Sequence, residues 1–169
     1  MKTMRLFLLT FCLLTLNLLW AQTPEEQLEK LGIELPAFSE PSANYVKWRQ
    51  VGNLLYLAGD GSDMKGKLGK DLTVEEGYQA ARMTGVDILS TLKAACGELS
   101  MIKQFVKVKG MVNSAPDLYD QPKVINGFSD LMVQVFGEKG KHARAAVGMV
   151  SLPSNIAVEI EVIVELEQE

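Results

Sequence analysis

The last apolar segment of the 169-residue chain, residues 156–166, constrains the fold more than any other stretch. Apolar side chains occupy its even positions, and glutamate occupies most of its odd positions. Successive side chains of a strand point to opposite faces, so this pattern predicts a strand with one buried and one polar face. The polar face is mixed, since Ala157 and Ile163 lie on it. We therefore expect a sheet that is covered on one side and either wet or closed against a second copy on the other.

Two segments before residue 60 predict a hairpin. Residues 45–51 and 54–58 flank Gly52-Asn53, a two-residue sequence of a favoured hairpin-turn type. The glycine-rich residues 59–70 that follow lack the ending of a phosphate-binding loop, and we expect a mobile surface loop there.

Two later segments predict further strands. Residues 101–114 alternate, and we expect Val108 and Val112 on the covered face, with Phe105 among the lysines on the other. Residues 144–152 form an apolar run after a loop, and Pro153 begins a turn into the final strand.

The longest predicted helix has clear signals at both ends. Thr73 and Glu76 form a T-x-x-E capping box, and Gly97 ends the helix. Between them, apolar residues recur at spacings of three and four. Gly85 lies on this stripe, which predicts close packing against the sheet.

Residues 121–137 predict a second helix, and residues 24–31 a short one capped by Thr23. The main elements therefore follow the order β-β-α-β-α-β-β. The fold class that this order indicates is α/β, a mixed sheet with two helices packed on one face.

Residues 1–21 have the composition of a secretory signal peptide. Lys2 and Arg5 precede an apolar run, and Ala21 is a small residue at the expected cleavage site. An uncleaved membrane anchor is the alternative, but the run is shorter than the roughly 20 apolar residues that span a bilayer. We expect a protein exported to the periplasm or secreted, with no membrane attachment after cleavage. Residues 22–40 would form a short helix and linker, and residues 41–169 the folded domain.

Charge and composition limit the partners and the chemistry. The formal net charge is −4, and removing Lys2 and Arg5 with the signal makes it −4 − 2 = −6. An acidic domain argues against a nucleic-acid partner, because phosphate binding rests on Lys and Arg. Cys96 is the one cysteine left, and His142 is the one histidine of the chain. No cluster has metal-ligand spacing, so we expect no metal, and Ser-His-Asp or Cys-His catalysis is disfavoured.

The segment "HARAAVGMVSLPSNIAVEIEVIV", residues 142–164, resembles the A-R-x-x-V…L-P…V-E-I-E signature of the RidA/YjgF family, which is often labelled endoribonuclease L-PSP-like. The resemblance covers residues 41–166. It implies a chorismate-mutase-like fold, a homotrimer and clefts between subunits. It also implies hydrolysis of 2-imino or enamine acids to 2-keto acids and ammonia, without a metal or an organic cofactor.

The resemblance assigns roles to five positions. Arg144 would hold the carboxylate of a small-molecule substrate, a task that suits the planar fork of guanidinium donors. Glu159 would position and activate water. Tyr45 would close the cleft, and Asn126 and Gly59 would contribute to substrate binding.

Two positions depart from the family pattern. Ala58 stands where many relatives have serine, and Ala146 where many have cysteine. These changes leave a second hypothesis open, a non-catalytic module of the same fold that binds a small carboxylate. Ribonuclease activity, the third hypothesis, is disfavoured because an acid–base pair of histidines is absent from the sequence.

Overall fold

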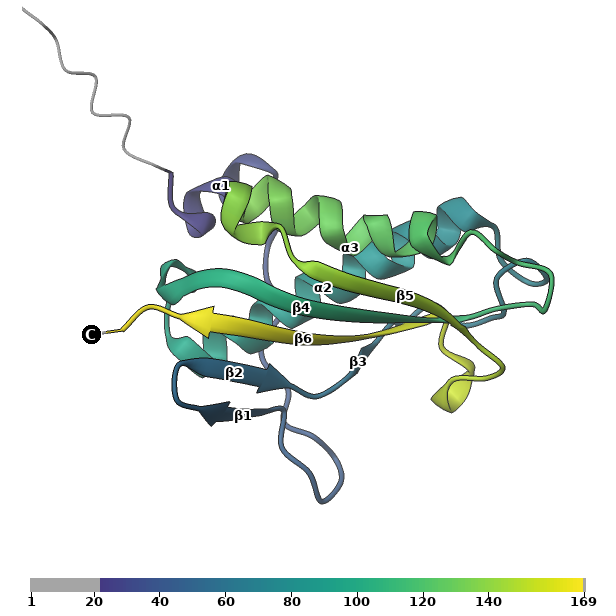
Figure 1. Ribbon diagram of the computed structural model, residues 1–169, viewed down its shortest axis with the longest axis horizontal. Helices are drawn as coiled ribbons and strands as arrows, with labels where there is room; N and C mark the ends of the chain where they lie inside the picture. The colour runs from purple at the N-terminus through teal and green to yellow at the C-terminus, as the bar shows by residue number, and fades with distance from the viewer. Residues whose placement is uncertain (1–21, 169) are drawn as a thin grey trace, which may run out of the picture.

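The computed structural model describes residues 22–168, in which two long helices cover one face of a sheet (Figure 1). The predicted signal peptide, residues 1–21, lies outside the described residues. Within residues 22–168, no helix combines the length and the apolar character needed to cross a bilayer.

The sheet has six strands and the order β1-β2-β6-β4-β5, with β3 paired to β6 off this path. All pairings are antiparallel except that of β4 with β5. The strands are β1 (Trp48–Val51), β2 (Leu54–Leu57), β3 (Asp60–Gly61), β4 (Ile102–Asn113), β5 (Ala143–Met149) and β6 (Val158–Leu166). The predicted order of strands and long helices is confirmed, and β3 is an addition that the sequence did not indicate.

The alternation of β6 is confirmed. Val158, Ile160, Val162 and Val164 are at most 1% exposed and face the helices. The opposite side, the open face, carries the other half of β6 and its cross-strand partners from β4. It comprises Lys107, Lys109, Met111, Glu159, Glu161 and Ile163.

The prediction for Phe105 was wrong. Phe105 is 2% exposed and packs in the core, with its ring centroid 5.0 Å from that of Phe136. The pairing of β4 with β6 shifts register between Ile102 and Gln104 and again between Phe105 and Lys107. Each irregularity changes which side chains face the core, so strict alternation fails in this half of β4.

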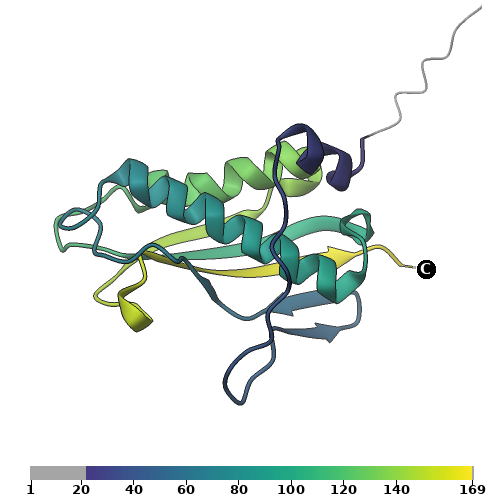
Figure 2. The same ribbon diagram turned by 180° about the vertical axis from the view of Figure 1, so that it is seen from behind.

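The two long helices are α2 (Val74–Cys96) and α3 (Gln121–Phe136), and Figure 2 shows both from the covered side. The Thr73–Glu76 capping box and the end at Gly97 are confirmed. The helices cross so closely that a Cβ at Gly127 would overlap the carbonyl of Tyr78. The nearest neighbours of Gly85 are side chains of α3, including Leu131, so this glycine packs against the second helix rather than the sheet.

The N-terminal segment, residues 22–40, is attached to the helix layer by burial of Leu28 and by hydrogen bonds. Helix α1 (Pro24–Lys30) buries Leu28, and its Glu25 Oε1 accepts a hydrogen bond of 2.7 Å from the backbone N–H of Leu99. The chain then crosses the outer surface of α2 (Figure 2), where the Ser90 hydroxyl donates to the Pro36 carbonyl at 2.7 Å.

The segment 59–70 packs onto the sheet, contrary to the predicted mobile loop. It contains β3, the buried Ser62 and the fully buried Leu68. Lys67 Nζ donates to Asn113 Oδ1 at 2.6 Å and to the Val150 carbonyl at 2.6 Å, which fixes the segment against the ends of β4 and β5.

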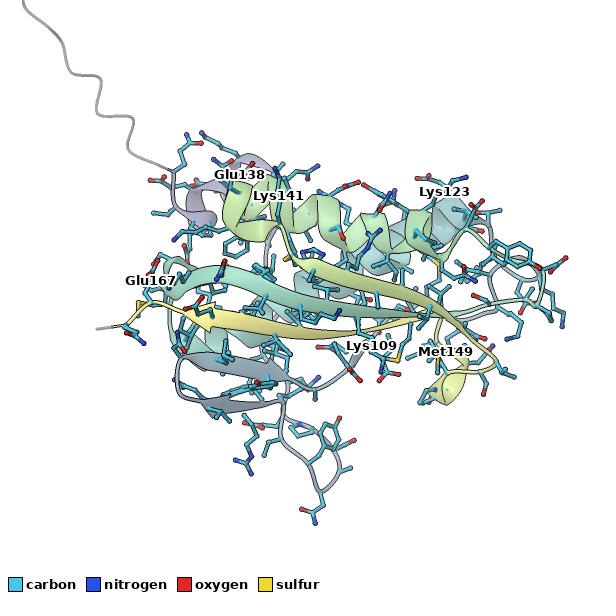
Figure 3. The ribbon with its side chains drawn as sticks, viewed as in Figure 1. Lys109, Lys123, Glu138, Lys141, Met149 and Glu167 are labelled. Atoms are coloured by element: carbon cyan, nitrogen blue, oxygen red, sulfur yellow. The ribbon has the colours of Figure 1, made fainter. Side chains whose placement is uncertain are left out.

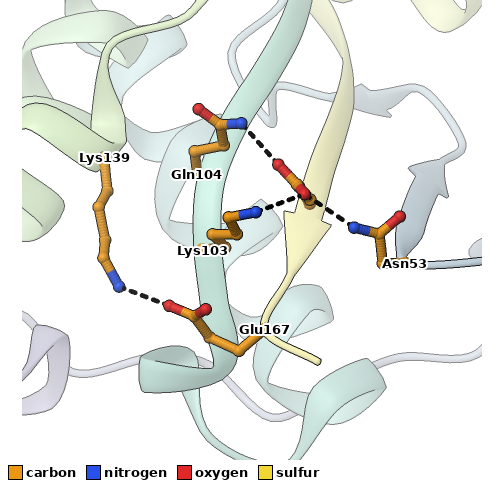
Figure 4. A network of polar contacts seen from close by, with 6 residues as sticks. Asn53, Lys103, Gln104, Lys139 and Glu167 are labelled. Atoms are coloured by element: carbon orange, nitrogen blue, oxygen red, sulfur yellow. Dashed lines mark hydrogen bonds and ion pairs between the residues drawn. The ribbon is translucent and has the colours of Figure 1, made fainter. Parts of the chain in front are cut away.

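One end of the sheet is held by a carboxylate network (Figure 4). Glu165 of β6 accepts hydrogen bonds from Lys103 at 2.8 Å, Gln104 at 2.6 Å and Asn53 at 2.8 Å. The Lys103 bond is the largest contribution that holds the pKa of Glu165 below its ordinary value. Nearby, Lys139 pairs with Glu167 at 3.1 Å. The contacts of Glu165 join the turn between β1 and β2 to β4 and β6, where β4 is irregular.

We predict opposite behaviour for two helix glycines. Gly127→Ala should lower the free energy of unfolding by about 2 kcal/mol, because the added methyl meets backbone atoms of α2 that cannot move aside. The methyl of Gly85→Ala meets side-chain atoms rather than backbone, at 3.0 Å or more. The gain in helix propensity, about 1 kcal/mol, should therefore offset most of its cost. Urea unfolding of both variants checks this, and equal losses would contradict the account of the crossing.

Candidate active site

Arg144 lies on the edge strand β5 and reaches the second helix. It pairs with the core residue Val108, so its side chain leaves the sheet on the helix-covered side. Its Nη1 donates to Asn126 Oδ1 at 2.8 Å and to Ser129 Oγ at 3.0 Å. Asn126 and Ser129 are three residues apart on α3 and therefore share one helix face. Arg144 and Asn126, two residues that the resemblance assigned to substrate binding, are therefore in direct contact.

The hydrogen-bond partners of the Arg144 guanidinium are neutral groups. Both contacts of its guanidinium are to an amide or a hydroxyl oxygen, and among residues 22–168 no carboxylate lies within 4.0 Å of it. The guanidinium carries five N–H donors, and these two contacts engage only Nη1. The arrangement leaves a fixed cation able to pair with an external anion.

Sequence reasoning missed two residues of this cluster, Ser129 and His142. The Ser129 hydroxyl lies 3.1 Å from His142 Nε2, and His142 Nδ1 lies 2.8 Å from the carbonyl oxygen of Gly140. Burial lowers the pKa of His142, a hydrogen bond to the Gly140 carbonyl raises it, and the charge of Arg144 lowers it further. A serine inside an amphipathic helix and a histidine in a loop carry no spacing that would indicate their contact.

Glu159 lies on the open face, in the middle of the sheet. Burial raises its pKa above the ordinary value, Glu161 adds to the rise, and Lys109 opposes it. Lys109 lies on the same face (Figure 3), and its Nζ is 3.6 Å from Glu161 Oε2. A carboxylate with a raised pKa is a stronger base than usual while it remains ionised, which suits activation of water.

Gly59 is placed beside Glu159. A Cβ at Gly59 would overlap Glu159 Oε1, so only a glycine leaves this carboxylate its position. The two residues are thus brought together, on the side of the sheet away from Arg144.

Arg144 and Glu159 do not meet within one chain. Arg144 aligns with Val108 and, through it, with Val162 on β6, three residues from Glu159. With one strand between them, the two Cα atoms are about 14 Å apart on standard sheet spacings. Their side chains also leave opposite faces of the sheet. A site that used both would need a second copy of the chain.

Tyr45 is also far from Arg144. It precedes β1, at the edge of the sheet opposite β5, and it is 52% exposed. Figure 1 shows the segment before β1 projecting beyond this edge. The predicted residues therefore fall into three places: Arg144 with Asn126, Glu159 with Gly59, and Tyr45 alone.

A second group of carboxylates lies beneath the N-terminal segment. Asp60, Asp63 and Asp87 line a cavity of about 300 Å³ with Lys47 and the backbone near Pro36. Lys47 Nζ lies 3.4 Å from both oxygens of Asp60. Burial, followed by the charges of Asp60 and Asp63, raises the pKa of Asp87 to about 6. In the part of the chain that the structure describes, no group of three or more His, Cys, Asp or Glu is arranged to hold a metal ion.

We predict that Asp87→Asn stabilises the protein at pH 8 but not at pH 4. The pKa of Asp87 is raised from 3.8 to about 6, so folding becomes less favourable as pH rises through this range. The full shift corresponds to about 3 kcal/mol, and solvent screening of a half-exposed carboxyl reduces the expected gain to about 1 kcal/mol. Urea unfolding at both pH values checks this. A gain that is the same at pH 4 and pH 8 would show that charge is not its cause.

Comparison with known proteins identifies the family. Residues 25–166 match the family described as "YjgF/chorismate_mutase-like, putative endoribonuclease". The chain belongs to this family, and its six-stranded sheet with helices on one face is the corresponding fold.

Relatives span most of the chain. Protein TCP17 of Trypanosoma cruzi is 44% identical over 146 residues, which cover 82% of this chain and 91% of TCP17. The crystal structure of Atu1372 from Agrobacterium tumefaciens, a protein of unknown function, is 43% identical with a TM-score of 0.80 and covers 86% of this chain and 94% of Atu1372. RidA from the Antarctic bacterium Psychrobacter sp. PAMC 21119 is 28% identical with a TM-score of 0.52, over 78% of this chain and 98% of RidA.

Proposed function

We propose that this protein hydrolyses reactive 2-imino acids, or their enamine tautomers, to 2-keto acids and ammonia, at clefts between the copies of a homotrimer. The observation that carries the proposal is Arg144, a cation fixed by Asn126 and Ser129 with no carboxylate among the described residues to neutralise it. Membership of the YjgF-like family and the likeness to a RidA structure support the reaction class. The signal-like composition of residues 1–21 supports a location in the periplasm or outside the cell for this activity.

The proposed site combines halves from two copies. Arg144 and Asn126 of one copy bind the substrate carboxylate. Glu159 and Gly59 of the next copy, with Tyr45 at the rim, face the imine carbon. The separation of these residues within one chain supports this division. Edge strand β5 would approach the open face of the neighbour.

The chemistry needs little beyond orientation. Glu159 accepts a proton from a water molecule as the water oxygen bonds to the imine carbon, and that proton is passed to the nitrogen. The resulting carbinolamine loses its hydroxyl proton to the nitrogen, the C–N bond breaks, and the 2-keto acid and ammonia leave. Positioning the carboxylate on Arg144 converts an encounter with water into a local reaction. Glu159 must be ionised, so turnover should fall as pH drops through its raised pKa.

A binding module without turnover is the second candidate function. Ala58 and Ala146 replace polar residues of the family pattern, and Ala146 packs against the core. The same Arg144 site would then hold a small carboxylate. The family description also names endoribonuclease activity, which the single histidine and the acidic net charge do not favour.

We predict that Arg144→Ala abolishes 2-imino acid hydrolysis by residues 22–169. An amino-acid oxidase would generate the imine in place, and keto-acid appearance would be followed. The rate above background should fall at least about hundredfold, because a charge-assisted contact to the carboxylate is lost. Arg82→Ala is the matched control, since Arg82 lies on α2 and bonds Gln134 at 2.9 Å.

Full activity in Arg144→Ala would contradict the proposal. A folded wild-type protein that binds 2-keto acids by calorimetry without accelerating hydrolysis would favour the binding module instead.

A further inference from the structure

Behind Arg144, a chain of hydrogen bonds runs from the guanidinium into the core. Arg144 Nη1 lies 3.0 Å from Ser129 Oγ, which lies 3.1 Å from His142 Nε2. His142 Nδ1 lies 2.8 Å from the Gly140 carbonyl. Three elements, α3, the turn before β5 and β5 itself, thus converge on one cation.

The direction of each bond follows from its partners. A carbonyl oxygen can only accept, so the hydrogen of a neutral His142 belongs on Nδ1. Nε2 is then an acceptor, and the Ser129 hydroxyl donates a hydrogen bond to it. The lone pairs of Ser129 Oγ remain free to accept from Arg144, which can only donate. Every member of the chain is satisfied in this single arrangement.

The surroundings of His142 favour the neutral ring. Its ring centroid lies 6.4 Å from that of Phe105 on β4 and 5.8 Å from that of Phe128 on α3. Its polar contacts are Ser129 on α3 and Gly140 in the preceding turn, both uncharged. The charged group acting on it is Arg144 on β5, which opposes a second positive charge. A protonated ring would have to donate from Nε2, which reverses the Ser129 bond and sets two cations on one oxygen.

We propose that Ser129 and His142 are positioning residues, which hold the Arg144 guanidinium in the orientation that receives a carboxylate, and that they do so only while His142 is neutral. The proposal rests on the proposed function in one respect, that Arg144 binds a carboxylate. Neither residue needs to touch the substrate.

A nucleophilic role for Ser129 fits the same contacts less well. Its oxygen accepts from Arg144, which makes the lone pairs less available for attack. It also sits within the 16-residue helix α3 rather than on an exposed turn.

The first test uses His142 alone and needs no ligand. Because it is the one histidine of the sequence, nitrogen-15 NMR of the labelled protein reports a single imidazole. At pH 7.5 we expect the neutral form with hydrogen on Nδ1, and Ser129→Ala should shift the Nε2 resonance selectively. Hydrogen on Nε2, or a charged ring at pH 7.5, would overturn the proposal.

The second test measures binding of pyruvate, a plain 2-keto carboxylate, by calorimetry at pH 7.5. Ser129→Ala and His142→Phe should each weaken binding about fivefold, the effect of losing one hydrogen bond that orients a charged group. His142→Phe keeps an aromatic ring against Phe105 and Phe128. His142→Gln is the rescue variant, because its amide oxygen can accept from Ser129, and it should bind within twofold of wild type.

The direction in which bound pyruvate shifts the pKa of His142 distinguishes a positioning residue from a neighbour that acts only through its charge. If protonation of His142 weakens pyruvate binding, pyruvate must lower the pKa of His142 by the same coupling. A histidine that acted only through its charge would show the reverse, since a bound anion stabilises a nearby cation. A raised pKa of His142 in the pyruvate complex, or unchanged affinity in both Ser129→Ala and His142→Phe, would overturn the proposal. Failure of the wild type to bind pyruvate would count against the proposed function, while the NMR test would still decide the arrangement of the chain.

Discussion

The pairing of β4 with β6 at the centre of the sheet is the constraint on which the rest of the structure depends. β6 is the strand that also carries β2 and β3, and β4 carries β5 on its other side. The alternation of β6 decides which side of the sheet the helices cover. The same alternation places Glu159 on the open face, and the parallel pairing of β5 places Arg144 on the covered one.

Local signals in the sequence were sufficient for most of the fold. The apolar period of β6, the capping box at Thr73 and the turn at Gly52 each depend on neighbouring residues, so they can be read without tertiary information. The irregular half of β4 could not be read in this way. Its register shifts arise from pairing with β6, and they turn Phe105 into the core. Strand β3 likewise exists only because β6 offers it a partner.

The candidate site likewise contains residues that the sequence indicated and residues that only the tertiary structure brings together. Arg144, Asn126 and Glu159 were assigned from a resemblance, and the contact between Arg144 and Asn126 joins α3 to β5. Ser129 and His142 could not be found from spacing, because their meeting depends on how the turn at Gly140 returns the chain to α3. The resemblance implied clefts between subunits, but it did not indicate how Arg144, Glu159 and Tyr45 are distributed within one chain.

That separation is central to the proposed function, since the two charged residues can cooperate only across an interface. Mixed oligomers test this most directly. Arg144→Ala and Glu159→Gln would each be inactive alone, and the two would be unfolded and refolded together. If the protein forms the proposed trimer, about a quarter of the clefts in a random mixture should pair an intact Arg144 with an intact Glu159, which predicts about a quarter of wild-type imine hydrolysis. Recovery of no activity by correctly assembled mixed oligomers would contradict a site shared between copies.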